Sequence, residues 1–372
     1  CKRTKKQTHS QKRNKERKDE RTKNKAPGHD GIPNKVVKLF KQYLLEPLTH
    51  IYNLSFSTGT FPTKLKHAKV IPIYKKKEHY ITANYRPINL LSVFNKLIEK
   101  LMYKRLYSFL DRFQILFKNQ FGFREKHSTT MALTEIVDKV REHVDNREHV
   151  LGIYLDLSKA FDTVDHNILL YKLEKYGIRG TAHNWFYSYL TNRSQTVFVN
   201  GTYSDVRHIE TGVPQGSVLG PLLFLIYVND IANCTTEDVI RSFADDTNVF
   251  ILSRCVNELY EKANGILEKL RKWFTDNKLT LNVDKTCYSI FTKAKHIETH
   301  DLHCGDKIVN RVKSAKYLGV ILDEDLSWND HVTYICSKLK KLTSAVYNLS
   351  TFIEHKHVPQ IYNSYIYQHI KY

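Results

Sequence analysis

The sequence predicts an α+β fold in which a sheet is backed by helices on one side. Short apolar runs rich in Val, Ile and Tyr at 68–74 and 150–157 indicate buried strands. Residues 239–252 have the pattern of a complete hairpin, and 92–110 and 129–144 have helical patterns. Hairpin-connected strands mixed with helices are typical of this class.

The chain enters this fold through a turn-rich segment and a helix. Two prolines and two glycines within 27–33 mark the turns. Apolar residues then recur at helical spacing through 36–45, which predicts a helix that precedes Pro47. Further along, 196–200 followed by Gly201 resembles one arm of a hairpin.

Two later segments predict helices that each pack one apolar face onto a sheet. Apolar residues recur at helical spacing within 259–274 and again within 332–349. A third helix is expected from Pro221 through an apolar run to Asn229 and Asp230, because proline suits the first turn of a helix.

Composition excludes several classes of protein. At 372 residues, with 41% hydrophobic and 12% aromatic residues, the chain is expected to fold around a large core, which excludes collagen-like, disulfide-stapled and wholly disordered proteins. The apolar run 218–228 is shorter than the roughly 20 residues of a membrane-spanning helix, so no membrane segment is expected. A start without methionine suggests a piece of a longer protein.

The six cysteines form no C-x-x-C pair, which suits a reduced, intracellular protein. Two of them lie near three histidines in a group that fits no standard zinc spacing: Cys287, His296, His300, His303 and Cys304.

The formal charge of +20 favours nucleic acid or another anionic surface as partner. Residues 1–25 hold twelve Lys or Arg residues against three acidic ones, and predict a disordered, solvated tail. The rest of the chain remains basic.

Carboxylates follow or join predicted strands at two distant places. Asp156 lies where the strand of 150–157 meets a polar turn, and Asp245 and Asp246 lie at the tip of the 239–252 hairpin. Aspartate is common in turns, but adjacent strands would gather these like charges at one end of a sheet, which is costly without cations. Oxygen ligands suit magnesium. Two magnesium ions held close together commonly catalyse in-line displacement at phosphorus.

A glycine-rich segment, GVPQGSVLGP at 212–221, lies between the two acidic elements. Gly212 and Gly216 allow tight turns and the close approach of a flat ligand. Such a segment alone is most simply a turn before a core helix. The order of acidic strand, P-Q-G turn with its helix, and acidic hairpin favours a functional role.

In these segments the chain resembles the reverse transcriptase domain of non-LTR (LINE-type) retrotransposons, within them the jockey and CR1-like elements. The resemblance covers nearly everything after residue 25. Besides the three segments above, it rests on APGHDGIP (26–33), NYRPINLLSVFNKLIEK (84–100), NQFGFR (119–124) and YLGV (317–320).

The resemblance implies a catalytic set. Asp156 and Asp245 match the ligands of two magnesium ions, for which manganese can substitute, and Asp246 lies beside them. Phe161 matches the steric gate that excludes a ribose 2′-hydroxyl, although core packing is the alternative for an aromatic after a strand. Lys285 matches a lysine proposed to protonate pyrophosphate, but a loop lysine needs no such role.

The resemblance also implies contacts to substrates. Gln215 matches a residue against the incoming nucleotide or its template partner, and Arg86 and Lys75 match cations that hold the triphosphate. A guanidinium in extended backbone before Pro87 suits phosphate, whereas a surface charge explains Lys75 equally well. The YLGV segment matches the hairpin that grips the primer end, with Tyr317, Leu318 and Gly319.

Residues of the NQFGFR segment have two open interpretations. The aromatic and basic side chains there either stack on or clamp a template, or simply pack: Gln120, Phe121, Phe123 and Arg124.

The fold implied by the resemblance is a right-hand polymerase with an antiparallel palm sheet. Its expected divisions are a basic tail (1–25), fingers (26–149), a catalytic palm (150–316), and a primer-grip hairpin with a truncated thumb (317–372).

The implied activity is RNA-directed DNA synthesis from dNTPs on a DNA primer, with the element RNA as template and location in the nucleus and cytoplasm. An upstream endonuclease domain is implied by the family. An RNA-dependent RNA polymerase shares the palm chemistry, but Phe161 disfavours it. Mobile-intron and telomerase-type enzymes are nearer alternatives, and a catalytically silent nucleic-acid-binding remnant is the alternative from another class.

Overall fold

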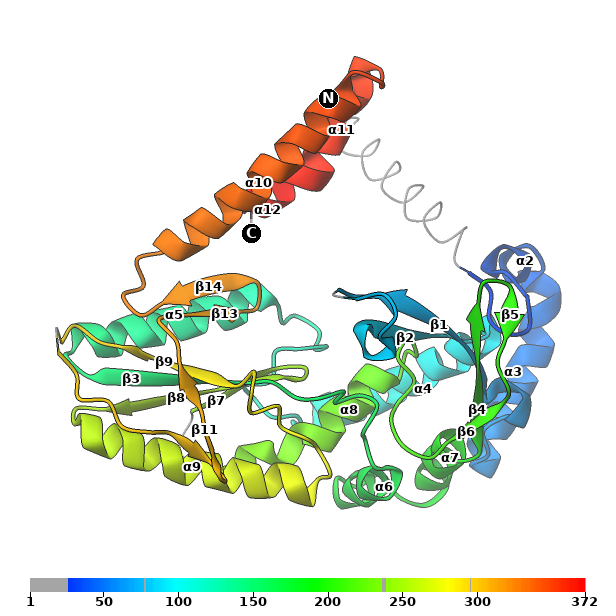
Figure 1. Ribbon diagram of the computed structural model, residues 1–372. Helices are drawn as coiled ribbons and strands as arrows, with labels where there is room; N and C mark the ends of the chain where they lie inside the picture. The colour runs from blue at the N-terminus through cyan, green and yellow to red at the C-terminus, as the bar shows by residue number, and fades with distance from the viewer. Residues whose placement is uncertain (1–25, 77, 236–238, 295, 372) are drawn as a thin grey trace, which may run out of the picture. The chain divides into compact units, whose positions relative to one another are not determined.

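The computed structural model describes residues 26–371 except 77, 236–238 and 295. The predicted disordered tail, 1–25, lies outside the described residues. The described chain is a mixed α+β protein, as the sequence predicts, and it divides into two compact units (Figure 1). Of the described residues, the first unit comprises those within 26–118, Ser158–Asn233 and Trp273–Thr280, and the second comprises those within Asn119–Leu157, 234–272 and 281–371.

Besides short 3-10 helices and the end of a helix that belongs mostly to the second unit, the first unit is built within its described part from six α-helices and five strands. They are α2 (Asn34–Leu39), α3 (Lys41–Thr58), β1 (His67–Tyr74), β2 (Tyr85–Leu90), α4 (Val93–Arg112), α6 (His166–Lys175), α7 (Gly180–Leu190), β4 (Arg193–Val199), β5 (Thr202–Tyr203), β6 (Arg207–Ile209) and α8 (Gly220–Val228).

The sheet of the first unit has the order β2-β1-β4-β5, and β6 also pairs with β4. Strand β1 pairs antiparallel with β2 and parallel with β4. Aromatic side chains dominate the core, where the Trp185 ring stacks on Tyr189 at 5.5 Å and meets Phe61 edge-on at 5.3 Å. Helix α8 is buried along nearly all its length, which explains its uniformly apolar sequence.

Helix α3 corrects one prediction, because it runs through Pro47 instead of ending before it. Proline cannot donate the backbone hydrogen bond of a helix interior. Contacts beyond the proline hold the helix: the Tyr52 hydroxyl donates to the Phe94 carbonyl at 3.0 Å, and Trp185 Nε1 donates to Ser55 Oγ at 3.0 Å. Tertiary packing therefore outweighs the local signal.

The second unit contains a larger share of strands. Its described elements are α5 (Thr129–Asp145), β3 (His149–Leu155), β7 (Ile240–Phe243), β8 (Asp246–Ser253), most of α9 (Val256–Asp276), β9 (Cys287–Phe291), β10 (His303–Cys304), β11 (Lys307–Ile308), β12 (Asn310–Arg311), β13 (Ser314–Tyr317), β14 (Val320–Asp323), α10 (Asn329–Ser350), α11 (Val358–Tyr362) and α12 (Gln368–Lys371).

Strand β3 is central in the sheet of the second unit, which has the order β12-β9-β3-β8-β7. It pairs antiparallel with both β8 and β9, and β7 and β8 form the predicted hairpin. Six of the seven β3 residues are buried, as expected for a continuous apolar run covered on both faces.

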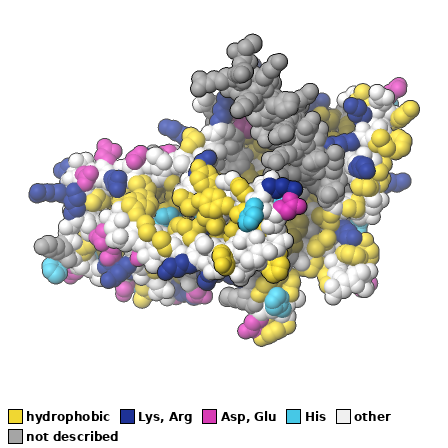
Figure 2. Space-filling model, turned by 90° about the horizontal axis from the view of Figure 1, so that it is seen from above, with side chains coloured by type: hydrophobic (Ala, Val, Ile, Leu, Met, Phe, Trp, Pro, Cys, Tyr) yellow, Lys and Arg dark blue, Asp and Glu magenta, His cyan; other side chains and the backbone are white. Residues whose placement is uncertain are grey.

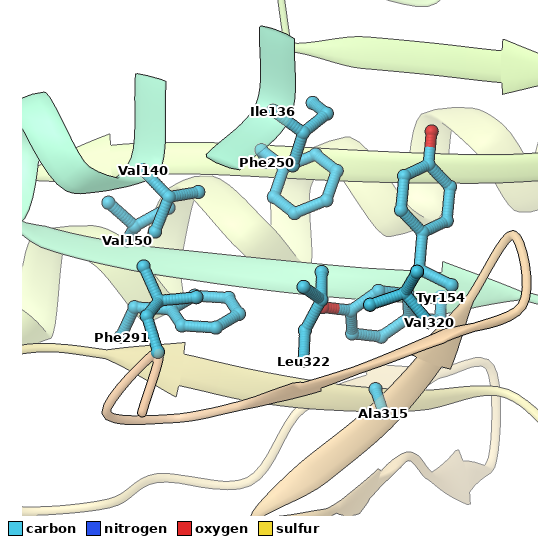
Figure 3. Close-up of a cluster of buried hydrophobic side chains, with 11 residues drawn as sticks. Ile136, Val140, Val150, Tyr154, Phe250, Phe291, Ala315, Val320 and Leu322 are labelled. Atoms are coloured by element: carbon cyan, nitrogen blue, oxygen red, sulfur yellow. The ribbon is translucent and has the colours of Figure 1, made fainter. Parts of the chain in front are cut away.

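The two faces of this sheet are covered differently. Helix α9 covers one face (Figure 1), and its buried residues include Leu259, Ala263 and Leu270 of the predicted apolar stripe. Helix α5 and the β13–β14 hairpin cover the other face, where Val140, Val150 and Phe291 share one apolar cluster (Figure 3). Helices therefore lie on both faces of this sheet, whereas the sequence analysis predicted helices on one face alone.

Helix α10 corrects a second expectation. The helix predicted from 332–349 is present, but no described α10 residue is buried, so no sheet covers its apolar stripe. The start of the helix does contact the β13–β14 hairpin, where the Ile321 N–H donates to His331 Nδ1 at 3.3 Å. Large apolar side chains remain at the surface, where Tyr347 of α10 is 72% exposed and Phe352, just after the helix, is 87% exposed. Hydrophobic side chains are also visible among the charged ones on the face that Figure 2 draws.

No helix in the described part of the chain combines the length and the hydrophobicity that crossing a membrane requires.

Candidate active site

The three aspartates singled out from the sequence lie at one end of the second unit's sheet. Leu155 and Thr247 are the last paired residues of β3 and β8, so Asp156 and Asp246 come next on the two adjoining strands. Asp245 lies in the turn that joins β7 to β8. The register of the sheet thus gathers carboxylates that lie about ninety positions apart in the sequence.

Electrostatics show that these carboxylates influence one another. Part of the Asp246 side chain reaches solvent, but its surroundings raise the pKa of its carboxyl to about 6. Burial is the largest cause, and repulsion by Asp245 and then Asp156 adds to it. The site therefore holds negative charge at a cost that a bound cation would relieve.

Lys285 is the fourth member of the group. Its Nζ atom lies 3.2 Å from Asp156 Oδ2, in an ion pair whose side chains are 67% and 42% exposed. The segment before β9 brings it there, because the Asn282 backbone N–H donates to the Asp156 carbonyl at 2.8 Å. A lysine distant in the sequence thus reaches the acidic end of β3.

The three carboxylates are ligands of the kind that magnesium prefers, but they do not by themselves form a complete metal site. Among the described residues, no three His, Cys, Asp or Glu side chains converge closely enough to hold a metal ion. Magnesium is commonly held by one or two carboxylates, with water and substrate phosphates completing its six positions. An oxygen-only set with open positions suits such shared coordination. The weak zinc grouping of Cys287 and Cys304 with neighbouring histidines likewise forms no metal cluster among residues that the structure describes.

Phe161 belongs to the first unit, where its ring stacks on Phe224 of α8 at a centroid distance of 4.3 Å. Its backbone carbonyl accepts a hydrogen bond from the Val213 N–H at 2.9 Å. The ring is half-buried, so it packs on one side while keeping part of its surface accessible.

Hydrogen bonds join the P-Q-G turn to two other segments of the first unit. Gln215 Nε2 donates to Asp162 Oδ1 at 2.7 Å, and the Gln215 carbonyl accepts from the Asn89 N–H at 2.8 Å. Gly216 has φ 115°, and a Cβ atom there would lie 2.7 Å from the Asn89 carbonyl oxygen. Only glycine suits this combination of conformation and close approach.

Arg86 and Lys75 lie on the β1–β2 hairpin of the first unit. Arg86 pairs in register with Ile73, and the Lys75 N–H donates to the Asn84 carbonyl at 2.9 Å. Lys75 directly follows β1, two positions after the partner of Arg86, so the two cations lie near one another along the hairpin, and both are exposed. This arrangement suits an anion, although it does not identify one.

The YLGV segment forms the turn of the β13–β14 hairpin. Leu318 and Gly319 lie at the turn with φ 45° and 95°, whereas Tyr317 is 2% exposed. The Tyr317 ring packs near Tyr154 and Phe250, with centroids 6.4 Å from each. Of the three predicted primer-grip residues, Tyr317 thus supports the hairpin from the core, and the turn itself meets solvent.

Glu99 is a buried carboxylate that sequence reasoning missed. It accepts hydrogen bonds from the Val218 N–H at 2.5 Å and from the Tyr189 hydroxyl at 2.8 Å. Burial raises the pKa of its carboxyl, while these hydrogen bonds and the nearby Arg193 act to lower it. The carboxylate therefore anchors the end of the P-Q-G turn, at the start of α8, from helix α4.

A signal for Glu99 was present in the sequence. Within the predicted helix of 92–110, Glu99 lies beside Ile98 and three residues before Met102, both of which are buried. A charged residue on the apolar face of a helix marks a buried polar contact.

Comparison with known proteins agrees with the sequence patterns. Residues 73–322 match the family described as "Reverse transcriptase (RNA-dependent DNA polymerase)". The chain is 32% identical over 319 residues to "RNA-directed DNA polymerase from mobile element jockey" of Drosophila melanogaster, covering 84% of this chain and 35% of that protein.

It is also 31% identical over 322 residues to "Probable RNA-directed DNA polymerase from transposon X-element" of the same organism, covering 85% of this chain and 35% of that protein. The chain thus spans about a third of the length of these relatives. A solved structure of telomerase from Candida albicans with a telomeric RNA fragment has a TM-score of 0.43 and 13% identity, over 89% of this chain and 60% of that one.

The order of the matching segments, the acidic end of the sheet and the extent of the family match lead to one assignment. The chain belongs to the reverse transcriptase (RNA-dependent DNA polymerase) family and is related to the polymerases of the jockey and X-element mobile elements.

Proposed function

We propose that this chain is an RNA-directed DNA polymerase that adds dNTPs to the 3′-hydroxyl of a DNA primer. The observation that carries the proposal is the meeting of Asp156, Asp245 and Asp246 at one end of adjoining strands, where burial and then repulsion by the other two carboxylates raise the pKa of Asp246 to about 6. Carboxylates gathered at such cost are expected where cations and phosphates bind.

Asp156 and Asp245 are the proposed ligands of two magnesium ions, with Asp246 adding charge beside them and manganese as a substitute. When bound, such ions lower the pKa of an attacking hydroxyl and stabilise charge on the triphosphate. The protein's own contribution is to hold the carboxylates at fixed positions relative to primer and nucleotide.

The proposed reaction forms a bond between the primer 3′-oxygen and the α-phosphorus, and breaks the bond from that phosphorus to the bridging oxygen of the departing pyrophosphate. The attacking hydroxyl would give its proton to bulk water. Lys285, whose ammonium lies beside Asp156, is the proposed donor of a proton to the pyrophosphate.

Residues of the first unit are proposed to bind the nucleotide. Phe161 would abut the sugar and exclude a 2′-hydroxyl, and its stacking on Phe224 supports a fixed ring position. Gln215 would lie against the nucleotide or its template partner. Arg86 and Lys75, both exposed on the β1–β2 hairpin, would hold the triphosphate.

The proposed partners are an RNA template, in particular the element's own RNA, and a DNA primer gripped by the β13–β14 turn. Lys and Arg contacts to phosphates should dominate affinity, so binding should weaken steeply with salt. Membership of the family also suggests an upstream endonuclease domain and a role in nucleus and cytoplasm.

The division into fingers (26–149), palm (150–316) and the beginning of a thumb (317–372) remains part of the proposal. Its support is the order of the matching segments along the chain.

Primer extension tests this function directly. Purified protein should extend a DNA primer on an RNA template with dNTPs and magnesium, and Asp245→Asn should abolish extension while leaving template-primer affinity largely intact. Binding without extension by the wild-type chain would favour the catalytically silent remnant. Equal extension by wild type and variant would remove the assigned role of Asp245.

A further inference from the structure

The NQFGFR segment lies along the edge of the catalytic hairpin in the second unit. The Ser242 N–H donates to the Asn119 carbonyl at 3.0 Å, and the Phe121 N–H donates to the Ser242 carbonyl at 2.8 Å. These bonds place Gln120 beside β7 in a short parallel pairing. The segment therefore borders the strand that leads to the turn of Asp245.

The side-chain amide of Gln120 holds the first residue of that turn at both of its backbone groups. Gln120 Oε1 accepts from the Ala244 N–H at 2.9 Å, and Nε2 donates to the Ala244 carbonyl at 3.4 Å. Oε1 also accepts from the Gly122 N–H at 2.8 Å. Gln120 is only 4% exposed, so water does not readily replace these bonds.

The turn needs such support because of its backbone conformation. Phe243 pairs with Asp246, which leaves Ala244 and Asp245 as the two turn residues. Ala244 has φ 59°, a left-handed value that is unfavourable for an L-residue and that hairpins usually assign to glycine, asparagine or aspartate. A strained residue persists only where its surroundings fix it.

Gly122 supplies a second support. A Cβ atom at this position would lie 2.2 Å from the Ala244 backbone nitrogen, so the segment passes directly against the turn. Only a residue without a side chain permits this approach. The Gly122 backbone and the Gln120 amide both contact the Ala244 backbone and together leave the turn little freedom.

We propose that Gln120 is a positioning residue that fixes the turn carrying Asp245 and Asp246. This inference rests on the proposed polymerase function, because it concerns the placement of the proposed metal ligands. Displacements of about 1 Å at a reacting centre can cost a hundredfold in rate. Gln120 thus acts through the Ala244 backbone, without touching a substrate.

Gln120→Met tests the proposal because methionine has a similar length and volume but cannot make the three hydrogen bonds. Hydrogen–deuterium exchange of residues 240–248 should become at least about tenfold faster, since the turn loses bonds that hold it closed. Manganese binding, followed by electron paramagnetic resonance, should weaken several-fold. The kcat for primer extension should fall at least about tenfold with the dNTP KM little changed.

Phe121→Leu is the matched control, because Phe121 is 6% exposed in the same segment and its backbone bond to Ser242 remains available. It should lower the melting temperature without changing exchange at 240–248 or manganese affinity. Gln120→Glu loses the donated bond and adds a buried negative charge near Asp245, so exchange at 240–248 should also become faster than in the wild type.

Unchanged exchange and manganese affinity in Gln120→Met would overturn the proposal, as would equal changes in Phe121→Leu. These measurements require no catalysis. If the wild-type chain fails to extend a primer, the polymerase proposal fails, while exchange and metal binding still decide whether Gln120 fixes the turn.

Discussion

Lys285 Nζ lies 3.2 Å from Asp156 Oδ2, so a cationic group adjoins the carboxylate at the end of β3. Both side chains are well exposed, and exposed ion pairs contribute little to folding stability. The pair is therefore more informative about chemistry: in the proposed reaction, an ammonium held beside the proposed metal ligand would lie near the departing pyrophosphate.

Lys285→Met is expected to lower kcat for nucleotide addition by about 10²–10⁴-fold, because it removes the proposed proton donor. Lys285→Arg should restore little of this loss, since a guanidinium keeps charge but does not release its proton. Pre-steady-state extension rates across pH would measure both variants. Full activity of the arginine variant would show that charge alone matters.

Phe161→Ala is expected to relax the rejection of ribonucleotides by about 10–100-fold, because it opens the space beside the sugar. Incorporation of rNTPs relative to dNTPs, measured as the ratio of kcat/KM values, provides the test. Phe161→Tyr keeps the ring and should retain selectivity. If the alanine variant rejects ribonucleotides as well as wild type does, the gate lies elsewhere.

Glu99→Ala is expected to lower the free energy of unfolding by about 2–5 kcal/mol, because it leaves the Val218 N–H and the Tyr189 hydroxyl without their buried acceptor. Urea unfolding at neutral pH measures the loss. Lys100→Ala, at the exposed neighbouring position, should change stability by less than about 0.5 kcal/mol. Similar losses in both variants would contradict the anchoring role.

His166 predicts a pH dependence of stability. Burial lowers the pKa of its ring, while its Nε2 bond to the Gly212 carbonyl and the nearby Asp165 act to raise it, and Arg193 acts to lower it. The unfolded chain, with a histidine pKa of about 6.5, therefore binds a proton before the folded chain does. The free energy of unfolding should therefore be highest above about pH 6.5, the pKa of histidine in the unfolded chain. It should decline as the pH falls from there toward the lower pKa of His166 in the folded chain.

Thermal unfolding between about pH 7.5 and 5.5 checks this sign. His166→Gln keeps a donor toward Gly212 and removes the titrating ring, so its stability should decline less over the same interval. Parallel curves for the two proteins would show that His166 contributes nothing to the dependence.

Local patterns predicted much of the secondary structure. The β3 strand, the β7–β8 hairpin and the helices α4, α5 and α9 follow from periodicity and residue type, and the structure confirms them. The helix predicted to end before Pro47 continues to Thr58, because tertiary contacts of Tyr52 and Ser55 stabilise α3 beyond the proline. The apolar residues of α10 recur at helical spacing and correctly predict a helix. Such spacing does not reveal which part of the protein, if any, covers the apolar face.

The order of the segments also placed the chain in its family, and it named the three aspartates as candidates. What periodicity cannot supply is register and partner choice. Nothing local to Gln120 indicates that its amide would bond Ala244, because those residues are brought together by a pairing between distant segments. The same holds for Glu99 and Val218.

By itself the sequence determined the family, the α+β class and the identity of the acidic residues, because short-range periodicity and the spacing of side-chain types are written along the chain. Only the tertiary structure decided which groups meet: Asp246 beside Asp156, Lys285 against Asp156, and Gln120 on the turn at Ala244. The physical reason is that hydrogen bonds and electrostatic interactions depend on distances in space, which long-range strand pairing fixes and chain order does not.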